Sequence, residues 1–197
     1  FLYVSHECPH FPFQGPKDVK KEVNKTNWMK PDADTYVTML EDLDSEVGRL
    51  LASLDKHKLA DNTLVIFVSD NGGFAGAANM GPFSGAKSTT MEGGIRVPGI
   101  IEWPNKNKKN RITNVPANTV DIYPTVLELA GIKQSNKQPL LDGVSLAELI
   151  HGKSFTRQKP MGFWHYPANG RGMRTRTMLE TLQKQQLAGV QAPAPKA

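Results

Sequence analysis

The longest regular hydrophobic pattern in the chain lies in residues 34–58, where apolar residues recur at steps of three and four. Its positions are Tyr36, Met39, Leu40, Leu43, Val47, Leu50, Leu51 and Leu54. They form a single apolar stripe at the helical period, so the pattern predicts an amphipathic helix. Asp34 is placed to cap the start of this helix, and the basic residues 56–58 suit the negative end of its dipole.

Shorter apolar runs predict strands at 1–5, 63–69 and 95–103, and a further strand at 161–166. The run TLVIFVS at 63–69 is almost continuously apolar, which is typical of a strand covered on both faces in a parallel sheet. Pro98 indicates an edge or a bulge in the third run. Because a helix precedes the strand at 63–69, the order of elements favours an α/β fold.

Two further helices are predicted in the second half of the chain. Residues 118–132 show a helical pattern, with Pro124 in its first turns and Gly131 at its C-cap. Residues 145–152 form a shorter helical pattern, and residues 174–189 are either a helix or an unstructured tail. Between residues 71 and 91 the chain is rich in Gly, Ala, Ser and Thr, which predicts a long loop of the kind that often carries function.

Composition narrows the class of protein. The chain has 197 residues, of which 39% are hydrophobic, and a net charge of +5. No apolar run approaches the roughly 18–20 residues that a membrane-spanning helix needs. The densest basic run, NKNKKNR at 105–111, has no aromatic residue within it, so we interpret it as a solvated loop and not as a nucleic-acid site. The single cysteine, Cys8, excludes an internal disulfide bond.

Polar residues follow two of the predicted strands, where an α/β sheet usually binds its ligands. Asp70 and Asn71 end the run at 63–69 and offer a carboxylate and an amide oxygen, the ligands that Ca²⁺ and Mg²⁺ prefer. Two ligands are too few for either ion, so others must come from elsewhere. The alternative interpretation of this dipeptide is an Asx turn that ends the strand.

Three other side chains are candidates for chemistry. Lys87, flanked by small residues, is able to reach an anion as a flexible point charge, although many loop lysines only face solvent. His6 and His10 lie in a proline-rich loop without the spacing of a zinc site, and either can act as an acid, a base or a donor to an anion. Cys8 has no surrounding pattern of a catalytic nucleophile, which favours a partly buried thiol.

In chain order, five segments together resemble the later part of the formylglycine-dependent sulfatases, which belong to the alkaline phosphatase superfamily. They are FLYVSHECPHFPFQGP, DNTLVIFVSDNGG, GAKSTTMEGGIRVPGIIEWP, VDIYPTVLELAGI and LDGVSL. The resemblance implies part of an alkaline phosphatase-like α/β fold, with a mixed or mostly parallel sheet sandwiched by helices. It also implies that residues 1–157 are the C-terminal portion of the catalytic domain, and that residues 158–197 begin a smaller C-terminal subdomain or form a tail.

The same resemblance assigns roles to matching positions. Asp70 and Asn71 resemble the family's calcium ligands, Lys87 resembles the lysine that binds the sulfate, and His10 resembles the histidine near the bridging oxygen of the ester. His6 does not fall on a family position. The implied substrate is a sulfated small molecule or a sulfated carbohydrate, and the implied location is outside the cytosol, because most of the family is exported.

One departure from the family pattern is large. The family's nucleophile is a formylglycine made from the first residue of a C/S-x-P-x-R motif, and no cysteine or serine of this chain begins such a motif. We therefore expect the formylglycine, and the early pair of aspartates that completes the calcium site, only in a part that precedes Phe1. The chain by itself is then expected to be an inactive sulfatase fragment.

Two alternatives stay open from the sequence. A phosphodiesterase or phosphonate hydrolase of the same superfamily shares the metal-binding strand, but such enzymes tend to have an Asp-His pair where this chain has Asp70 and Asn71. A chain without catalytic activity that binds anionic glycans is compatible with the absent nucleophile.

Overall fold

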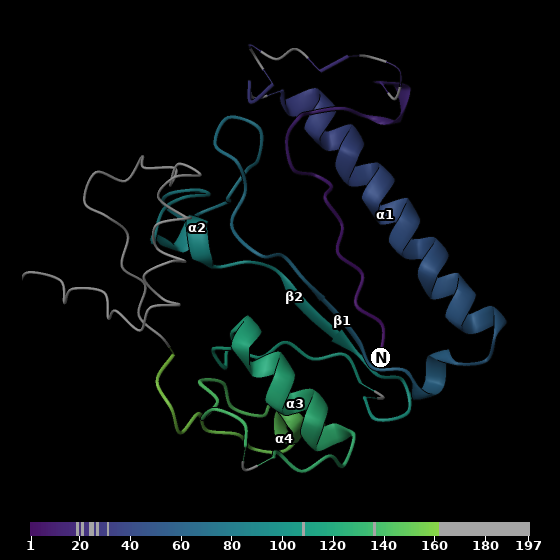
Figure 1. The fold of residues 1–197 in the computed structure, drawn as a ribbon, viewed down its shortest axis with the longest axis vertical. Helices are drawn as coiled ribbons and strands as arrows, with labels where there is room; N and C mark the ends of the chain where they lie inside the picture. The colour runs from purple at the N-terminus through teal and green to yellow at the C-terminus, as the bar shows by residue number, and fades with distance from the viewer. Residues whose placement is uncertain are drawn as a thin grey trace, which may run out of the picture. The chain divides into compact units, whose positions relative to one another are not determined.

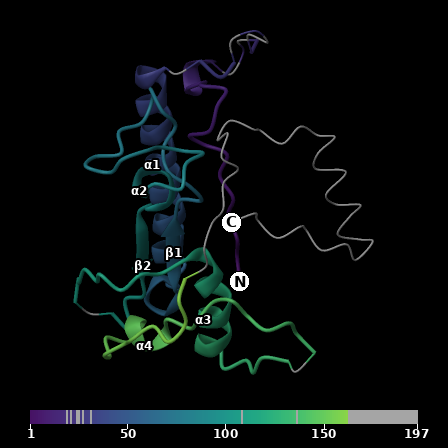
Figure 2. The same ribbon diagram turned by 90° about the vertical axis from the view of Figure 1, so that its left-hand side faces the viewer.

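The computed structural model describes residues 1–161 except for 19, 21, 24, 25, 27, 31, 108 and 136. Its elements in chain order are η1 (Pro16–Asp18), α1 (Ala33–Lys56), η2 (Ala60–Asn62), β1 (Val65–Val68), α2 (Glu92–Ile95), β2 (Gly99–Glu102), η3 (Thr119–Asp121), α3 (Ile122–Leu129) and α4 (Ala147–Ile150). Figure 1 shows α1 running beside the two strands, and both Figure 1 and Figure 2 place α3 and α4 together at one end of them. Within this described part, no helix is long and apolar enough to cross a bilayer.

The long amphipathic helix is confirmed as α1, with a different residue at its N-cap. Asp32, not Asp34, caps the helix: its backbone is extended and its side chain accepts a hydrogen bond from the Thr35 N–H at 3.0 Å. The cap must be the residue just outside the first helical turn, and Asp34 already lies within that turn. Hydrogen bonds from Thr35 hold the pKa of Asp32 below its ordinary value.

The strand predicted at 63–69 is confirmed as β1, and the described sheet consists of β1 and β2. The two strands pair antiparallel, with Val65 opposite Glu102 and Val68 opposite Gly99. β1 is therefore not covered on both faces within the described residues, since Phe67 and Val68 are each 40% exposed. The predicted α/β class nevertheless matches this arrangement of helices and strands.

Two strand predictions need correction. Residues 1–5 form no strand, because this extended segment makes no backbone hydrogen bond to any other described segment and its side chains are exposed. The strand predicted at 95–103 is shorter and begins only at Gly99, because residues 92–95 form the short helix α2. Pro98 therefore precedes the strand and does not interrupt it.

The helices predicted at 118–132 and 145–152 are confirmed in shortened form. Asn118 and Asp121 form a capping box that starts η3 and leads directly into α3. Pro124 lies in the first turn of α3, and Gly131 follows the helix at φ +68°, a left-handed conformation that glycine adopts without strain. The shorter helical pattern is α4.

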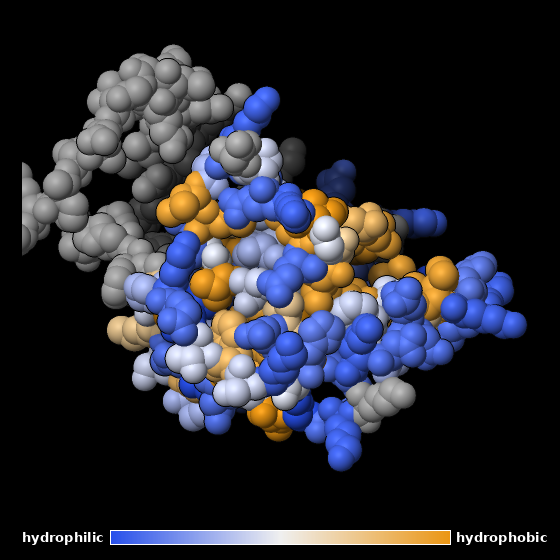
Figure 3. Space-filling model, turned by 90° about the horizontal axis from the view of Figure 1, so that it is seen from below, coloured by the Kyte–Doolittle hydropathy of each residue, from blue (hydrophilic) through white to orange (hydrophobic). Residues whose placement is uncertain are grey.

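The most deeply buried residues join α3 to α4. Thr125 donates a hydrogen bond to the Asp121 carbonyl at 2.6 Å and accepts one from the Leu146 N–H at 2.8 Å. Ala147 and Ile150 of α4 are buried beside them. This cluster is small, and many large apolar side chains stay exposed; Figure 3 shows them as orange groups among hydrophilic residues on the face seen from below.

Several predictions fall on residues that the structure does not describe. The predicted strand at 161–166 lies outside the described residues beyond Met161, as does the predicted helix or tail at 174–189. The division of the chain at residue 157 also stays a prediction, because residues 162–197 are not described.

Candidate functional site

The candidate metal ligands lie directly after the carboxyl end of β1. Asp70 is exposed and Asn71 is half-buried. Ser69 donates a hydrogen bond from its hydroxyl to the Asn71 carbonyl at 2.9 Å, which fixes the turn immediately after the strand. No ion pair occupies Asp70 in the described part of the chain. The carboxylate and the amide are therefore available as a pair of oxygen ligands.

Glycines allow another part of the chain to approach this turn very closely. The Gly72 N–H bonds to the Gly94 carbonyl at 2.9 Å, and the Gly93 N–H bonds to the Ser84 carbonyl at 2.7 Å. A Cβ atom added at Gly72 would stand 1.9 Å from the Gly93 carbonyl oxygen, a distance that no real side chain tolerates. The DNGG and MEGG segments therefore depend on glycine to pack against each other.

Lys87 lies beside the turn that follows β1. Its backbone N–H bonds to the Gly73 carbonyl at 2.9 Å, and its half-buried side chain places Nζ 5.9 Å from the centre of the Phe11 ring. The Thr89 hydroxyl donates to the Ala86 carbonyl at 2.8 Å and holds the loop in shape. The backbone at Lys87 is thus held at a defined place, and its side chain is half-buried.

His10 lies in the proline-rich loop, next to Phe11, whose ring is near Lys87. Its ring centre lies 4.0 Å from that of Phe11, and its Nδ1 lies 2.8 Å from the Phe11 carbonyl oxygen. A carbonyl oxygen only accepts hydrogen bonds, so Nδ1 carries the proton in this contact. In the neutral ring Nε2 is then left as an acceptor, and in the protonated ring it is a donor.

Phe11 is the point at which the three segments meet. It contacts His10 and Lys87 as described, and its ring packs edge-on against Phe74, which follows the DNGG turn, at 5.3 Å between centres. The structure therefore places the segment of His10 and Phe11 beside Lys87 and the loop that follows β1. The sequence analysis did not single out Phe11. The feature that could have indicated it is an aromatic residue between the two prolines of PHFP.

Other residues singled out from the sequence take no part in this site. Cys8 donates to the Met39 carbonyl at 3.1 Å, and burial, together with the charge of Asp42, raises the pKa of its thiol. This is the structural thiol that the sequence favoured, since a raised pKa weakens a nucleophile. Residues 1–7, which include His6, are all exposed.

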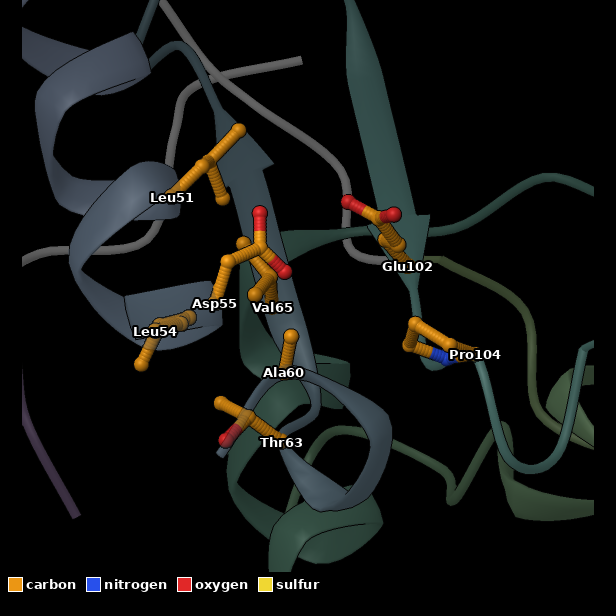
Figure 4. A pocket seen from close by; sticks show the side chains of 8 residues that line it. All are labelled: Leu51, Leu54, Asp55, Ala60, Thr63, Val65, Glu102 and Pro104. Carbon is orange, nitrogen blue, oxygen red and sulfur yellow. The ribbon is translucent and has the colours of Figure 1, made fainter. Parts of the chain in front are cut away.

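The described residues do not complete a metal site. They contain no cluster of three or more His, Cys, Asp or Glu side chains arranged to hold an ion. A cavity of about 160 Å³ lies between α1 and the start of β1, where Asp55 and Glu102 line it (Figure 4). It adjoins Val65, at the opposite end of β1 from Asp70, so it is separate from the candidate site.

A buried ion pair is the second feature that the sequence analysis missed. Arg157 donates to both carboxylate oxygens of Asp121, at 2.7 and 2.9 Å, and that carboxylate is fully buried. Burial alone would raise the pKa of Asp121, but hydrogen bonds from Arg157, Val144 and Asn118 outweigh it and lower the pKa. The Asn-x-x-Asp spacing at 118–121 indicated a capping box, but no local signal pointed to an arginine 36 residues away.

Comparison with known proteins matches the chain to one family. A family model described as Sulfatase matches residues 1–132, and one described as N-sulphoglucosamine sulphohydrolase, C-terminal, matches residues 86–184. A sulfatase of Formosa agariphila is 37% identical over 181 residues, which cover 85% of this chain and 32% of that protein. Human steryl-sulfatase is 37% identical over 129 residues, which cover 60% of this chain and 22% of that protein.

The fold of the chain is also similar to that of a solved structure. The crystal structure of Ps i-CgsB in complex with k-i-k-neocarrahexaose has a TM-score of 0.65 and 34% identity, covering 78% of this chain and 34% of that one. The α/β fold class predicted from the sequence is confirmed by this similarity. The chain spans about a third or less of the length of these relatives.

Proposed function

The chain belongs to the sulfatase family, and on this premise we propose that it carries one part of an active site that hydrolyses sulfate esters. The observation that supports the proposal is the meeting of His10, Lys87 and the Phe74 loop at Phe11. The segment that carries His10 and Phe11 is far in the sequence from the loop at 71–91, which carries Phe74 and Lys87.

Lys87 and His10 are proposed to act on the sulfate and on the leaving oxygen. Hydrolysis transfers a sulfuryl group to water, and negative charge develops on the oxygen that leaves. The backbone bond to Gly73 holds the main chain of Lys87 in place, so its positive charge needs little reorganisation to stabilise the leaving oxygen, as preorganised groups do. The protonated His10 ring, anchored through Nδ1, would donate its Nε2 proton to the leaving oxygen.

Asp70 and Asn71 are proposed to supply part of a Ca²⁺ site. Their oxygens fit a hard cation, and the described ion pairs do not include Asp70. Calcium needs about six to eight oxygen ligands, so these two residues fit as one section of the site and require further ligands. When bound, the ion would polarise the sulfate oxygens.

The nucleophile is proposed to lie outside this chain, because no residue here begins a C/S-x-P-x-R motif. The isolated 197-residue chain is therefore expected to release no p-nitrophenol from p-nitrophenyl sulfate. Turnover above the uncatalysed rate would contradict this assignment.

A sulfated carbohydrate is the proposed substrate class. The support is the similarity to Ps i-CgsB, whose structure is described in complex with k-i-k-neocarrahexaose. We also propose, from the family, that the complete protein acts outside the cytosol.

A chimera tests the function. This chain would be joined to the part of the Formosa agariphila sulfatase that lies outside the match, and the formylglycine content would be verified by mass spectrometry. We expect hydrolysis of sulfated carrageenan oligosaccharides that is lost in Lys87→Ala and His10→Ala and kept in Lys106→Ala. A formylglycine-containing chimera whose activity is unchanged by Lys87→Ala and His10→Ala would remove these residues from the proposed site.

A further inference from the structure

Asn71 is followed by Gly72, and an asparagine before a glycine is chemically labile. Glycine has no Cβ, so it leaves its own backbone nitrogen accessible and the local backbone flexible. In the reaction, the Gly72 nitrogen bonds to Cγ of Asn71, the bond from Cγ to Nδ2 breaks, and Nδ2 leaves as ammonia with the proton of the backbone nitrogen. Water then opens the five-membered imide, which gives aspartate or isoaspartate.

The peptide group between Asn71 and Gly72 is held on both sides by hydrogen bonds. Its carbonyl oxygen accepts a bond from the Ser69 hydroxyl at 2.9 Å. Its N–H donates to the Gly94 carbonyl, also at 2.9 Å. The nitrogen that would have to attack is therefore already engaged, and the peptide group cannot rotate without breaking both bonds.

Close packing against α2 restricts the same peptide group further. A Cβ atom added at Gly72 would stand 1.9 Å from the Gly93 carbonyl oxygen and 2.8 Å from the Gly94 Cα, so α2 lies directly against this part of the main chain. Ring closure requires Cγ of the half-buried Asn71 to approach the Gly72 nitrogen, which needs rotation of both side chain and backbone. The reaction therefore requires that α2 first move away.

We propose that Asn71 is a deamidation site controlled by α2: the docked helix keeps the amide intact, and undocking of the helix exposes the amide to conversion. α2 is suited to local opening, because it has four residues and its buried residues are Gly93 and Gly94, which have no side chain to anchor it. Ile95, its large apolar residue, is 42% exposed. Segments with few buried apolar contacts open at a lower free energy than the whole domain.

Deamidation would alter the candidate metal ligands, a consequence that rests on the proposed function. Aspartate at position 71 turns the pair of carboxylate and amide into two carboxylates and adds one negative charge. Isoaspartate also routes the main chain through Cβ and Cγ, which lengthens the backbone by one atom next to Asp70. The conversion itself does not depend on the proposed function, because it needs only Asn71, Gly72 and water.

The test follows the 197-residue chain in mildly alkaline buffer with and without urea, and peptide mapping by mass spectrometry measures aspartate and isoaspartate at position 71 over time. The sequence contains one other Asn-Gly pair, at 169–170, which serves as the standard for the rate in urea. Gly93→Ala displaces α2, because its Cβ would stand 2.3 Å from the Gly85 carbonyl oxygen. Ser69→Ala removes the bond to the Asn71 carbonyl, and Ser53→Ala, at an exposed serine of α1, is the matched control.

We expect Asn71 to deamidate about tenfold or more slowly in buffer than in urea, where its rate should match the standard, because only the opened minority reacts. Gly93→Ala and Ser69→Ala should each raise the rate in buffer, and Ser53→Ala should not. Circular dichroism verifies that each variant keeps its helices, and if Gly93→Ala unfolds, Ser69→Ala alone decides. The inference is overturned by equal rates in buffer and urea, or by folded variants that react no faster than the control. An inactive chimera with an intact Asn71 would count against the proposed function alone.

Discussion

Replacing Arg157 by alanine should destabilise the fold strongly, because it would leave a carboxylate buried without its counter-ion. The Asp121 side chain is 0% exposed, and it accepts two hydrogen bonds from Arg157 and one each from the N–H groups of Asn118 and Val144. Removing one partner of a buried ion pair costs about 3–5 kcal/mol. In a domain of this size, that loss lowers Tm by about 6–20 °C.

Thermal and urea unfolding, followed by circular dichroism, measure the loss, and Arg49→Ala is the matched control. Arg49 and Glu46 form an ion pair of the same 2.7 Å length, but both side chains are exposed, so this change should leave Tm nearly unaltered. Equal effects of Arg157→Ala and Arg49→Ala would refute the reasoning, because burial would then not decide the strength of the pair.

The pH dependence provides a second measurement of the same pair. The folded pKa of Asp121 lies below its ordinary value of 3.8, so its contribution to stability is present above that pH and is lost as the pH falls through the folded pKa. Without Arg157, the hydrogen bond and the positive charge that lower this pKa are lost, so the pKa should rise above that of the unmodified protein. The acid-unfolding midpoint of Arg157→Ala should therefore lie at a higher pH than that of the unmodified protein, and an unchanged midpoint would count against the assigned cause.

Three further predictions concern the candidate site and its surroundings. In an active chimera, Lys87→Ala should lower kcat about 10²–10³-fold, as expected for one lost charge stabiliser, while Lys106→Ala should not; equal rates would exclude the role. Gly72→Ala should lower Tm because its Cβ would collide with a carbonyl oxygen, whereas Gly48→Ala, in open space within α1, should stabilise the helix by about 1 kcal/mol. The same sign of change in both would contradict the close packing. Cys8 should react with iodoacetamide at pH 7 more slowly than a free cysteine peptide, because its pKa is raised; an equal or faster rate would disprove the burial.

Much of the fold followed from local patterns. The stripe of apolar residues in 34–58 located α1, the apolar run at 63–69 located β1, and the glycine at position 131 marked the end of α3. The errors also have local causes. Residues 1–5 have the composition of a strand, but a strand exists only where a neighbour accepts its backbone hydrogen bonds, and no described segment does so.

For the candidate site, the sequence by itself determined which residues are candidates for chemistry. Asp70 and Asn71 follow a strand, and Lys87 and His10 lie in loops, because side-chain type and position in the chain are local properties. Their roles in sulfate hydrolysis stay proposals.

Only the tertiary structure decided which of these residues meet. The glycine contacts between the DNGG and MEGG segments, the place of Lys87 beside Phe11, and the burial of Asp121 against Arg157 all join residues distant in sequence. Such contacts depend on how the chain crosses itself, and no periodicity of hydrophobic and polar residues records that. The antiparallel pairing of β1 with β2 is of the same kind.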